Sequence, residues 1–462
     1  MKKFDLIVLG SGPGGQRAAI QAAKLGKQVG IVERREIVGG VTAHTGTIPS
    51  KTLRETVLHL SGINQRCFYG QGYRAKQDIT IDDLLTRLQT TINQQIQIIQ
   101  DQLTRNGVTT ITGTASFIDE HTIQVVTADN NETRYQADYF VIATGTLPHR
   151  PDHIPFNNTT IIDSDGILGI DRIPRTMSII GGGVIGVEYA TIFSALDVKV
   201  TVIDGREKIL DFIDDEIIDD FRHDIKERGV ALRLGEEVIG VEETDDGQTI
   251  ANLKSGKRVK GEVLMAAAGR VGATSELELH NVGIEPDDVG RLKVDDNYTT
   301  NVRNIYAVGD VIGFPALAST SAEQGRFAAC HAFRNTSSES FKLFPFGIYA
   351  IPPISVVGKT EQELKADNTP YEMGTARLKE TARGQIRGNA QGLLKLLFSL
   401  TDRKLLGVHI VGEGATELIH IGQAVIAHGG KLDYFVDAVF NYPTLAEAYK
   451  VAALDAWNRI SL

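Results

Sequence analysis

Cysteine is almost absent from this chain. The 462 residues include two cysteines, Cys67 and Cys330, which lie far apart in the sequence. Neither has a second cysteine or a histidine at the spacing of a redox or metal-binding pair. We therefore expect each to be a buried small apolar side chain or a surface thiol, and we expect no metal site.

Long apolar runs are missing as well. No run of about 18 apolar residues occurs, so no membrane span is expected. The N-terminus, "MKKFDLIVLGSG", starts like a signal peptide, but its apolar run is short and leads directly into a glycine turn. We interpret it as the first strand of the fold and expect a cytoplasmic protein. The net charge of −10 argues against nucleic acid or an anionic membrane as the main partner.

Two segments of the sequence repeat one pattern, residues 4–36 and residues 176–208. Each has an apolar run, a glycine turn, a stretch of helical periodicity, a second apolar run and an acid. The acid follows the first glycine of the turn by 23 positions in both segments. The pattern predicts two strand-loop-helix-strand units of the kind that binds dinucleotides, and therefore an α/β protein.

The first turn, "GSGPGG", carries glycines at the three positions that such a unit requires. Gly10 permits the tight turn, Gly12 lets the backbone approach a pyrophosphate, and Gly15 lets helix and strand pack closely. The helix that follows directs its N–H groups at the phosphates. Glu33, at the end of the second apolar run, is expected to accept hydrogen bonds from a ribose diol.

The second turn, "GGGVIG", repeats these positions. Its glycines are Gly181, Gly183 and Gly186. Asp204 stands where Glu33 stands in the first unit, and an acid there favours the free 2′-hydroxyl of NAD over a 2′-phosphate. Arg206 and Lys208 follow closely and either could turn to the 2′-phosphate of NADP, or both could belong to a solvated loop. The sequence leaves NAD and NADP open at this turn.

The remaining sequence shows alternating elements. Residues 79–106 predict a long amphipathic helix, and residues 111–145 predict short strands that end in "YFVIATG". A third block, 259–310, ends in "IYAVGD", and strand-like and helix-like runs alternate from about residue 340. The prolines of "HRPDHIPF", residues 149–156, indicate a domain boundary.

Seven motifs carry a resemblance to a known family: "GSGPGG", "IPSK", "VIATG", "GGGVIGVE", "AAAGR", "IYAVGD" and "YPTLAEA". Together they resemble the class I pyridine nucleotide-disulfide oxidoreductases, the flavoprotein family of dihydrolipoamide dehydrogenase, glutathione reductase and mercuric reductase. The resemblance covers essentially all 462 residues. It implies two Rossmann-like dinucleotide-binding domains, a C-terminal α+β dimerisation domain, and a homodimer or larger even-numbered assembly.

The resemblance also implies domain limits and bound cofactors. FAD would bind the first unit, and NAD or NADP the second. The expected domains are an FAD-binding domain in two parts, 1–148 and 267–338, an NAD(P)-binding domain, 149–266, and a dimerisation domain, 339–462.

Individual residues receive roles from the resemblance. Asp310 of "YAVGD" would bind the ribityl chain of FAD, and Gly269 and its neighbour Arg270 would lie near the NAD(P) site. Lys51 would lie beside flavin N5 and pair with Glu188; an ammonium there stabilises the electron-rich ring, and a carboxylate orients the ammonium. Further expected contacts of FAD are Thr42, Ala115, Ala143, Thr144, Gly145 and Ala318.

Three residues depart from the disulfide reductases of this family. Thr42 and Thr47 occupy the positions of the two redox cysteines, and Tyr442 occupies the position of the acid-base histidine. A threonine forms neither a thiolate nor a disulfide, and a phenol with an unperturbed pKa of ~10 is a poor base near neutral pH. Thiol chemistry is therefore not expected, and electrons from the flavin must have another acceptor.

Four segments look most like the soluble pyridine nucleotide transhydrogenases within the family: "GTIPSK" and "NYPTLAEAY", which extend two of these motifs, and "IHIGQA" and "DVIGFPALAS". The resemblance implies hydride transfer between NADPH and NAD⁺ through flavin N5, in a ping-pong sequence at one nicotinamide pocket. Two alternatives stay open. One is an NAD(P)H oxidase or diaphorase that passes electrons to oxygen or quinones, and the other is a non-catalytic flavoprotein that serves as a binding module.

Overall fold

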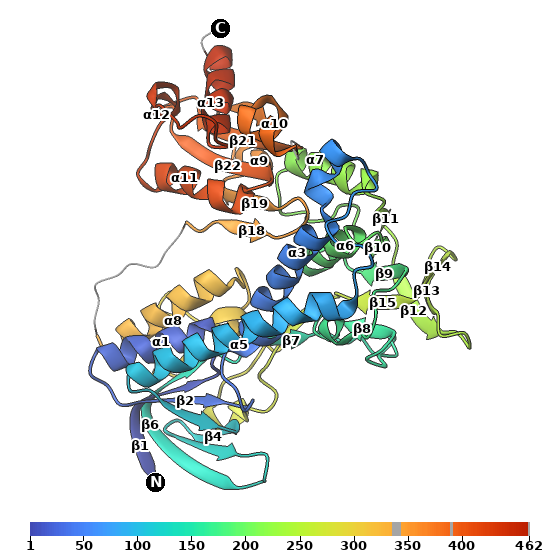
Figure 1. Cartoon of the computed structure of the whole chain (residues 1–462). Helices are drawn as coiled ribbons and strands as arrows, with labels where there is room; N and C mark the ends of the chain where they lie inside the picture. The colour runs from blue at the N-terminus through green and yellow to red at the C-terminus, as the bar shows by residue number, and fades with distance from the viewer. Residues whose placement is uncertain (335–342, 389–390, 461–462) are drawn as a thin grey trace. The chain divides into compact units, whose positions relative to one another are not determined.

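The computed structural model describes residues 1–334, 343–388 and 391–460. Its contacts divide the chain into two compact units (Figure 1). The first unit comprises Met1–Thr52, Leu85–His149 and Gly269–Phe341, and the second comprises Leu53–Leu84, Arg150–Ala268 and Lys342–Leu462. None of the helices in the described part of the chain is both long and apolar enough to cross a membrane.

A sheet of seven strands, counted over the described residues, forms the centre of the first unit. Its strands are β3 (Thr109–Thr112), β2 (Val29–Glu33), β1 (Lys2–Leu9), β6 (Glu132–Ile142), β5 (Thr122–Val126) and β4 (Thr114–Asp119), with β17 (Ile305–Ala307) paired to β6. β1 pairs in parallel with β2 and β6, and β17 adds a further parallel strand. The N-terminal apolar run is therefore the first strand, as the sequence predicts, and the structure places it inside the sheet, between β2 and β6.

Helices cover this sheet. α1 (Pro13–Lys24) follows the first glycine turn and packs along α8 (Ala318–Ala332), as Figure 1 shows. The two helices can approach closely because Gly325 has no side chain. A Cβ at this position would lie 2.0 Å from the carbonyl oxygen of Gly14. The predicted long helix is α5 (Ile81–Arg105). The unit also contains α2 (Gly40–His44), β7 (Thr146–Pro148), β16 (Arg270–Gly272), η3 (Leu279–Val282) and η4 (Gly309–Ile312).

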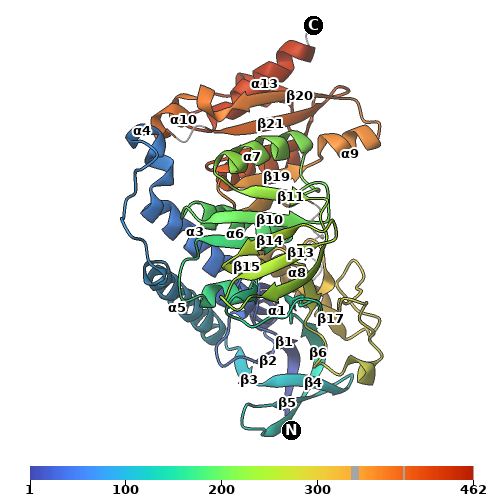
Figure 2. The ribbon, with the colours of Figure 1, turned by 90° about the vertical axis from the view of Figure 1, so that its right-hand side faces the viewer.

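The second unit repeats the strand-turn-helix-strand pattern. Its parallel sheet has the order β11 (Ala231–Leu234), β10 (Lys199–Asp204), β9 (Thr176–Ile180), β15 (Val263–Ala266) and β8 (Ile161–Asp163). Figure 2 labels β11, β10 and β15 of this sheet. α6 (Val184–Ser194) links β9 to β10, and α7 (Asp215–Glu227) links β10 to β11. Both repeats that the sequence predicts are therefore present.

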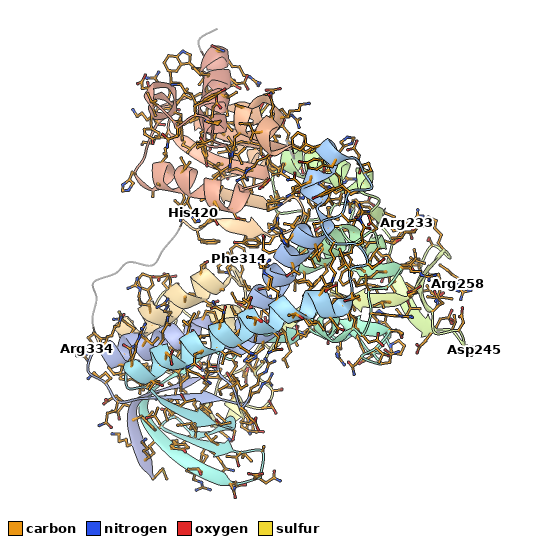
Figure 3. The ribbon with its side chains drawn as sticks, viewed as in Figure 1. Arg233, Asp245, Arg258, Phe314, Arg334 and His420 are labelled. Carbon is orange, nitrogen blue, oxygen red and sulfur yellow. The ribbon has the colours of Figure 1, made fainter. Side chains whose placement is uncertain are left out.

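A small antiparallel sheet follows in the same unit. It consists of β12 (Val238–Glu243), β13 (Thr249–Leu253) and β14 (Arg258–Gly261). Figure 3 shows Asp245 in the turn after β12, and Arg258 on β14. The side chain of Arg258 pairs across this sheet with Glu242.

The C-terminal part of the second unit is an antiparallel sheet with helices. The strands are, in spatial order, β18 (Phe346–Ile348), β19 (Ile354–Gly358), β22 (Leu405–Gly412), β21 (Gly392–Ser399) and β20 (Tyr371–Arg377). The helices are α9 (Glu361–Ala366), α10 (Ala382–Arg387), α11 (Ala415–Ala427), α12 (Leu432–Asp437) and α13 (Glu447–Ile460). This confirms the expected α/β fold with a C-terminal α+β part. The expected domain boundary at 338/339 lies outside the described residues.

Short helical segments complete the second unit. They are η1 (Ile63–Gln65), α4 (Arg66–Tyr69), η2 (Gly166–Gly169) and η5 (Leu378–Glu380), together with most of α3 (Thr47–Ser61). The unit's apolar core includes side chains of α6, α7 and the parallel sheet.

A buried lysine lies in β21. The side chain of Lys395 is 0% exposed, and its Nζ lies 2.9 Å from Asp214 Oδ1, 3.1 Å from Glu216 Oε2 and 2.6 Å from Glu361 Oε2. Asp214 also caps the N-terminus of α7 by accepting a hydrogen bond from the backbone N–H of Glu216. The ammonium thus binds three carboxylates: Asp214 at the N-cap of α7, Glu216 on α7 and Glu361 on α9.

Candidate functional site

A pocket lies in the first unit beside the glycine turn between β1 and α1. It is lined by this turn, the end of β2, the segment after β6 and the beginning of η4. The sequence-predicted residues that line it are Gly10, Gly12, Glu33, Thr42, Ala115, Ala143, Thr144, Gly145, Asp310 and Ala318. Gly15 and Lys51 do not line it. The fold thus collects most of the expected FAD contacts, from segments far apart in the sequence, around one pocket.

The glycine turn has room for a ligand at one position and none at two others. Gly10 has a φ of +102°, and a Cβ there would lie 2.4 Å from the carbonyl oxygen of Ala143. A Cβ at Gly15 would lie 1.9 Å from the carbonyl oxygen of Gly10. At Gly12, by contrast, no atom of the described residues beyond its two chain neighbours lies within 4 Å of such a Cβ. Gly12 therefore presents bare backbone to the pocket, directly before the N-terminus of α1, where N–H groups favour an anion.

Glu33 is held in place by hydrogen bonds at the end of β2. Its Oε2 accepts from the backbone N–H of Ser11 at 3.1 Å and from Ser11 Oγ at 2.5 Å, and its Oε1 accepts from the N–H of Arg35 at 3.1 Å. Sequence reasoning missed Ser11, although this residue lies inside the "GSGPGG" turn. Ser11 also accepts a hydrogen bond from the N–H of Gly39, and so links the turn to the segment after β2.

Two polar groups in the pocket, a half-buried carboxylate and a buried hydroxyl, support a polar ligand. Burial raises the pKa of Asp310, against the opposing effects of the nearby Arg270 and of a 3.4 Å hydrogen bond from Ser321. Thr144 Oγ1 is buried and has no hydrogen-bond partner among the described residues. A buried hydroxyl without a partner costs free energy unless a ligand satisfies it. These groups therefore fit a ligand with several hydroxyls, as the ribityl chain of FAD has.

Thr42 and Thr47 lie at the same pocket. Thr42 is on α2, Thr47 is the first residue of α3, and both line the cavity. No residue described as lining this cavity contains sulfur. Cys67 is exposed, Cys330 is buried, and both are free thiols, which confirms the expectation from their spacing.

The second glycine turn repeats the geometry of the first. Gly181 has a φ of +108°, and a Cβ there would lie 2.4 Å from the carbonyl oxygen of Ala267. A Cβ at Gly186 would lie 1.9 Å from the carbonyl oxygen of Gly181. Gly183 is the N-cap residue of α6. The side chain of Asp204 accepts from the N–H of Gly182 at 2.6 Å, as Glu33 does from Ser11 in the first unit.

Arg206 is bound to the acid of this second turn. Its Nε lies 3.1 Å from Asp204 Oδ1, and one terminal nitrogen, Nη2, lies 2.8 Å from Asp204 Oδ2. Burial alone raises the pKa of Asp204, but hydrogen bonds from Arg206 and Gly182 outweigh burial and lower it. Lys208 makes an exposed ion pair with Asp215 at 2.8 Å. The carboxylate that is expected to repel a 2′-phosphate is therefore neutralised by the side chain that is expected to attract it.

Glu188 and Lys51 lie in different units. Glu188, on α6, is 4% exposed, and its Oε1 accepts a 2.8 Å hydrogen bond from the N–H of Tyr349. Sequence reasoning missed Tyr349, because no local pattern links the segment after β18 to α6. Lys51 lies on the part of α3 that belongs to the first unit. The expected Lys51–Glu188 pair stays a prediction.

Two other expected site residues have clear surroundings. Gly269 and Arg270 begin the last segment of the first unit, and Arg270 donates to Thr146 Oγ1 at 2.8 Å and to the Thr146 carbonyl at 2.9 Å. Their expected closeness to the NAD(P) of the second unit stays a prediction. Tyr442, between α12 and α13, is 73% exposed.

Comparison with known families decides the classification. The family described as pyridine nucleotide-disulphide oxidoreductase matches residues 4–325. The chain belongs to this family. The dimerisation domain of the pyridine nucleotide-disulphide oxidoreductases matches residues 344–453. The protein is therefore an oxidoreductase of a family that uses FAD and pyridine nucleotides, and it carries that family's dimerisation domain.

Relatives of this oxidoreductase are similar over their full length. The soluble pyridine nucleotide transhydrogenase of Mycobacterium tuberculosis is 53% identical over 461 residues, which cover 100% of this chain and 98% of the relative. The soluble pyridine nucleotide transhydrogenase of Photobacterium profundum is 46% identical over 462 residues, which cover 99% of this chain and 98% of the relative. The resemblance seen in the motifs is confirmed by these similarities.

Solved structures share the fold. LpdA from Mycobacterium tuberculosis is 26% identical, with a TM-score of 0.89 over 98% of this chain and 99% of that chain. The HOCl-induced flavoprotein disulfide reductase RclA from Escherichia coli is 24% identical, with a TM-score of 0.87 over 97% of this chain and 99% of that chain. The likeness to RclA concerns the fold alone.

Proposed function

We propose that this oxidoreductase transfers hydride between NADPH and NAD⁺ with FAD as cofactor and without a redox-active disulfide. The observation that carries the proposal is the full-length identity of 53% and 46% to relatives named soluble pyridine nucleotide transhydrogenase. Thr42 and Thr47 support it, because the pocket that they line offers no thiol in its described lining to receive electrons.

The first unit provides a fitting site for FAD. Bound there, FAD would supply N5 of its isoalloxazine ring as the atom that exchanges hydride with a nicotinamide. The backbone at Gly12 and the first turn of α1 would hold the pyrophosphate, and Glu33 the adenosine ribose. Asp310 and the unpartnered hydroxyl of Thr144 would hydrogen-bond the polyol chain.

Lys51 and Glu188 are the proposed catalytic residues. The ammonium of Lys51 would stabilise negative charge that develops on the ring system, and Glu188 would orient that ammonium or the nicotinamide amide. Glu188 is suited to this role because the N–H of Tyr349 holds its carboxylate at 2.8 Å. A carboxylate held in this way needs little reorganisation during the reaction.

The second glycine turn would bind both nicotinamide nucleotides in succession. NADPH would bind first and leave as NADP⁺, and NAD⁺ would then occupy the same turn beside Asp204 and Arg206. This sequence of events predicts ping-pong kinetics. The proposed domain limits stay those of the sequence: 1–148 and 267–338 for FAD, 149–266 for NAD(P) and 339–462 for dimerisation. We also propose a homodimer or larger even-numbered assembly in the cytoplasm.

The test is an anaerobic two-step reaction of the FAD-loaded protein. One equivalent of NADPH should bleach the flavin absorbance, and a spectrally distinct NAD⁺ analogue should restore it and yield the reduced analogue. No long-wavelength thiolate-to-flavin charge-transfer band should accompany the bleaching. The Thr42→Cys/Thr47→Cys double variant is the matched control, because it restores two thiols at the same pocket and should produce that band.

Other outcomes identify the alternative functions. Bleached protein that ignores the NAD⁺ analogue but recovers its absorbance rapidly in oxygen or with a quinone is an NAD(P)H oxidase or diaphorase. Protein that binds FAD but reacts with no donor or acceptor is a non-catalytic binding module. Reduction of lipoamide or glutathione disulfide at the rate of NAD⁺ reduction contradicts the absence of thiol chemistry.

A further inference from the structure

The two dinucleotide units differ in the side chain that donates to the acid. In the first unit, Ser11 donates to Glu33 through both its backbone N–H and its hydroxyl. In the second unit, Gly182 provides the N–H at 2.6 Å, and the place of the hydroxyl is taken by the guanidinium of Arg206 at 2.8 Å from Asp204 Oδ2. The second unit thus uses a movable cation where the first uses a short fixed side chain.

A side chain at Gly182 cannot replace this cation. A Cβ built there would lie 2.7 Å from Ile209 Cγ2 and 3.2 Å from Asp204 Oδ2. Gly183 is the next residue of the turn, and a Cβ built there would lie 3.9 Å from Arg206 Nη2. The guanidinium therefore lies between the glycine turn, where such a unit binds the pyrophosphate, and Asp204, where it binds the adenosine ribose.

The guanidinium binds two different acids through its two edges. Nε and Nη2 face Asp204, whose side chain is 8% exposed, at 3.1 and 2.8 Å. Nη1 faces Asp211, whose side chain is 50% exposed, at 3.1 Å. The buried contact has two hydrogen bonds in a low-dielectric setting, whereas water screens the exposed contact. An incoming anion thus displaces Asp211 more readily than Asp204.

A 2′-phosphate and a 2′-hydroxyl respond differently to this arrangement. A phosphate monoester carries about −1.5 to −2 charges near pH 7 and accepts several hydrogen bonds, so it can compete for Nη1. A guanidinium has five N–H donors in a planar fork and can bridge two anions at once. Arg206 can therefore stay on Asp204 while it exchanges Asp211 for phosphate. A neutral hydroxyl does not compete for a cation in this way.

We propose that Asp211 sets the preference between 2′-phosphorylated and unphosphorylated nucleotides by competing with the 2′-phosphate for Arg206 Nη1. The inference rests on the proposed function, because that function requires both nucleotides at one turn. It makes Asp211 a specificity-determining residue, although Asp211 belongs to neither the glycine turn nor the acid position.

The test is calorimetric binding of two fragments to the full-length, FAD-loaded protein at fixed low ionic strength. The fragments are adenosine 2′,5′-bisphosphate and adenosine 5′-monophosphate, which differ in the 2′-phosphate and contain no nicotinamide. Asp211→Asn should tighten binding of the bisphosphate about two- to fivefold, the range of an exposed ion pair, and should change binding of the monophosphate less. Asp219→Asn is the matched control, because Asp219 is 75% exposed and pairs with Arg222 in the same unit.

The double variant Arg206→Ala/Asp211→Asn separates competition from general repulsion. If Asp211 acts through Arg206, the gain for the bisphosphate disappears when Arg206→Ala is the background. A gain of equal size in that background overturns the proposal, as does an equal gain from Asp219→Asn or an equal gain for both fragments. Absence of bisphosphate binding to the native protein also overturns it. If the fragments bind as expected but the protein transfers no hydride between NADPH and NAD⁺, the proposed function is contradicted and the role of Asp211 in nucleotide preference still stands.

Discussion

Removal of the buried ammonium of Lys395 should destabilise the second unit strongly. Lys395→Met keeps most of the side-chain length but leaves Asp214, whose side chain is 1% exposed, without its cation at 2.9 Å. Glu216 and Glu361 lose the same partner. Removing one partner of a buried ion pair costs about 3–5 kcal/mol, because the remaining charge stays buried and uncompensated.

Thermal unfolding of the second unit, followed by calorimetry or circular dichroism, measures this cost. A change of 1 kcal/mol shifts Tm by about 2–4 °C in a domain of about 150–250 residues, so Lys395→Met should lower Tm by roughly 6–20 °C. Lys365→Met is the matched control. Lys365 lies 2.7 Å from Oε1 of the same Glu361, but its side chain is 64% exposed, so water screens the pair and its loss should lower Tm far less.

The difference between native protein and Lys395→Met should also depend on pH. Burial raises the pKa of Glu361, but hydrogen bonds from Lys365, Lys395 and Tyr371 outweigh burial and lower it to about 2 from an ordinary 4.5. A lowered carboxyl pKa stabilises the fold above the ordinary pKa, and the stabilisation is lost as the pH falls toward 2. The Tm difference should therefore be full near neutral pH and shrink below about pH 4.5. Equal Tm values for Lys395→Met and Lys365→Met near pH 7 would refute the reasoning.

Further predictions concern the cofactor, the chemistry and the assembly. Asp310→Ala should lower the FAD content of purified protein, measured as flavin absorbance per chain; unchanged content would exclude a polyol contact. Gly10→Ala should also abolish FAD binding, because its Cβ would lie 2.4 Å from the Ala143 carbonyl oxygen; normal FAD content would contradict the turn geometry. Glu188→Gln should slow the bleaching of flavin by NADPH at unchanged FAD content; an unchanged stopped-flow rate would show that Glu188 takes no part in flavin reduction. Light scattering should show a dimer or larger even-numbered assembly, and a monomer at micromolar concentration would contradict it.

Features with local causes were predictable from the sequence. The two glycine turns were predictable because glycine adopts a positive φ readily and other residues rarely do. Gly10 and Gly181 have φ values of +102° and +108°. The acids Glu33 and Asp204 end their strands, and each follows a short apolar run after a helix of similar length, 12 residues in α1 and 11 residues in α6. The long helix over residues 79–106 was predictable because its apolar face repeats with helical periodicity.

The tertiary structure alone decided which distant residues meet. β17 joins the first sheet by pairing with β6, and the "IYAVGD" segment thereby carries Asp310 to the pocket that contains the glycine turn. Ser11 lies between two glycines of its motif and reaches Glu33 only after folding, and Tyr349 contacts Glu188 across 161 positions of sequence. Such contacts depend on chain pairings between remote segments, which periodicity within one segment does not encode.

Charge placement shows the same division. In the sequence, Lys395 is one polar residue within "LLKLLFSL", and Arg206 is one of two cations after an acid. Folding surrounds Lys395 with carboxylates from two helical segments and directs Arg206 back onto Asp204. The sequence determined which charged groups the protein has and where they lie along the chain. Only the tertiary structure decided which of them lose water and pair, because burial and distance depend on the whole fold.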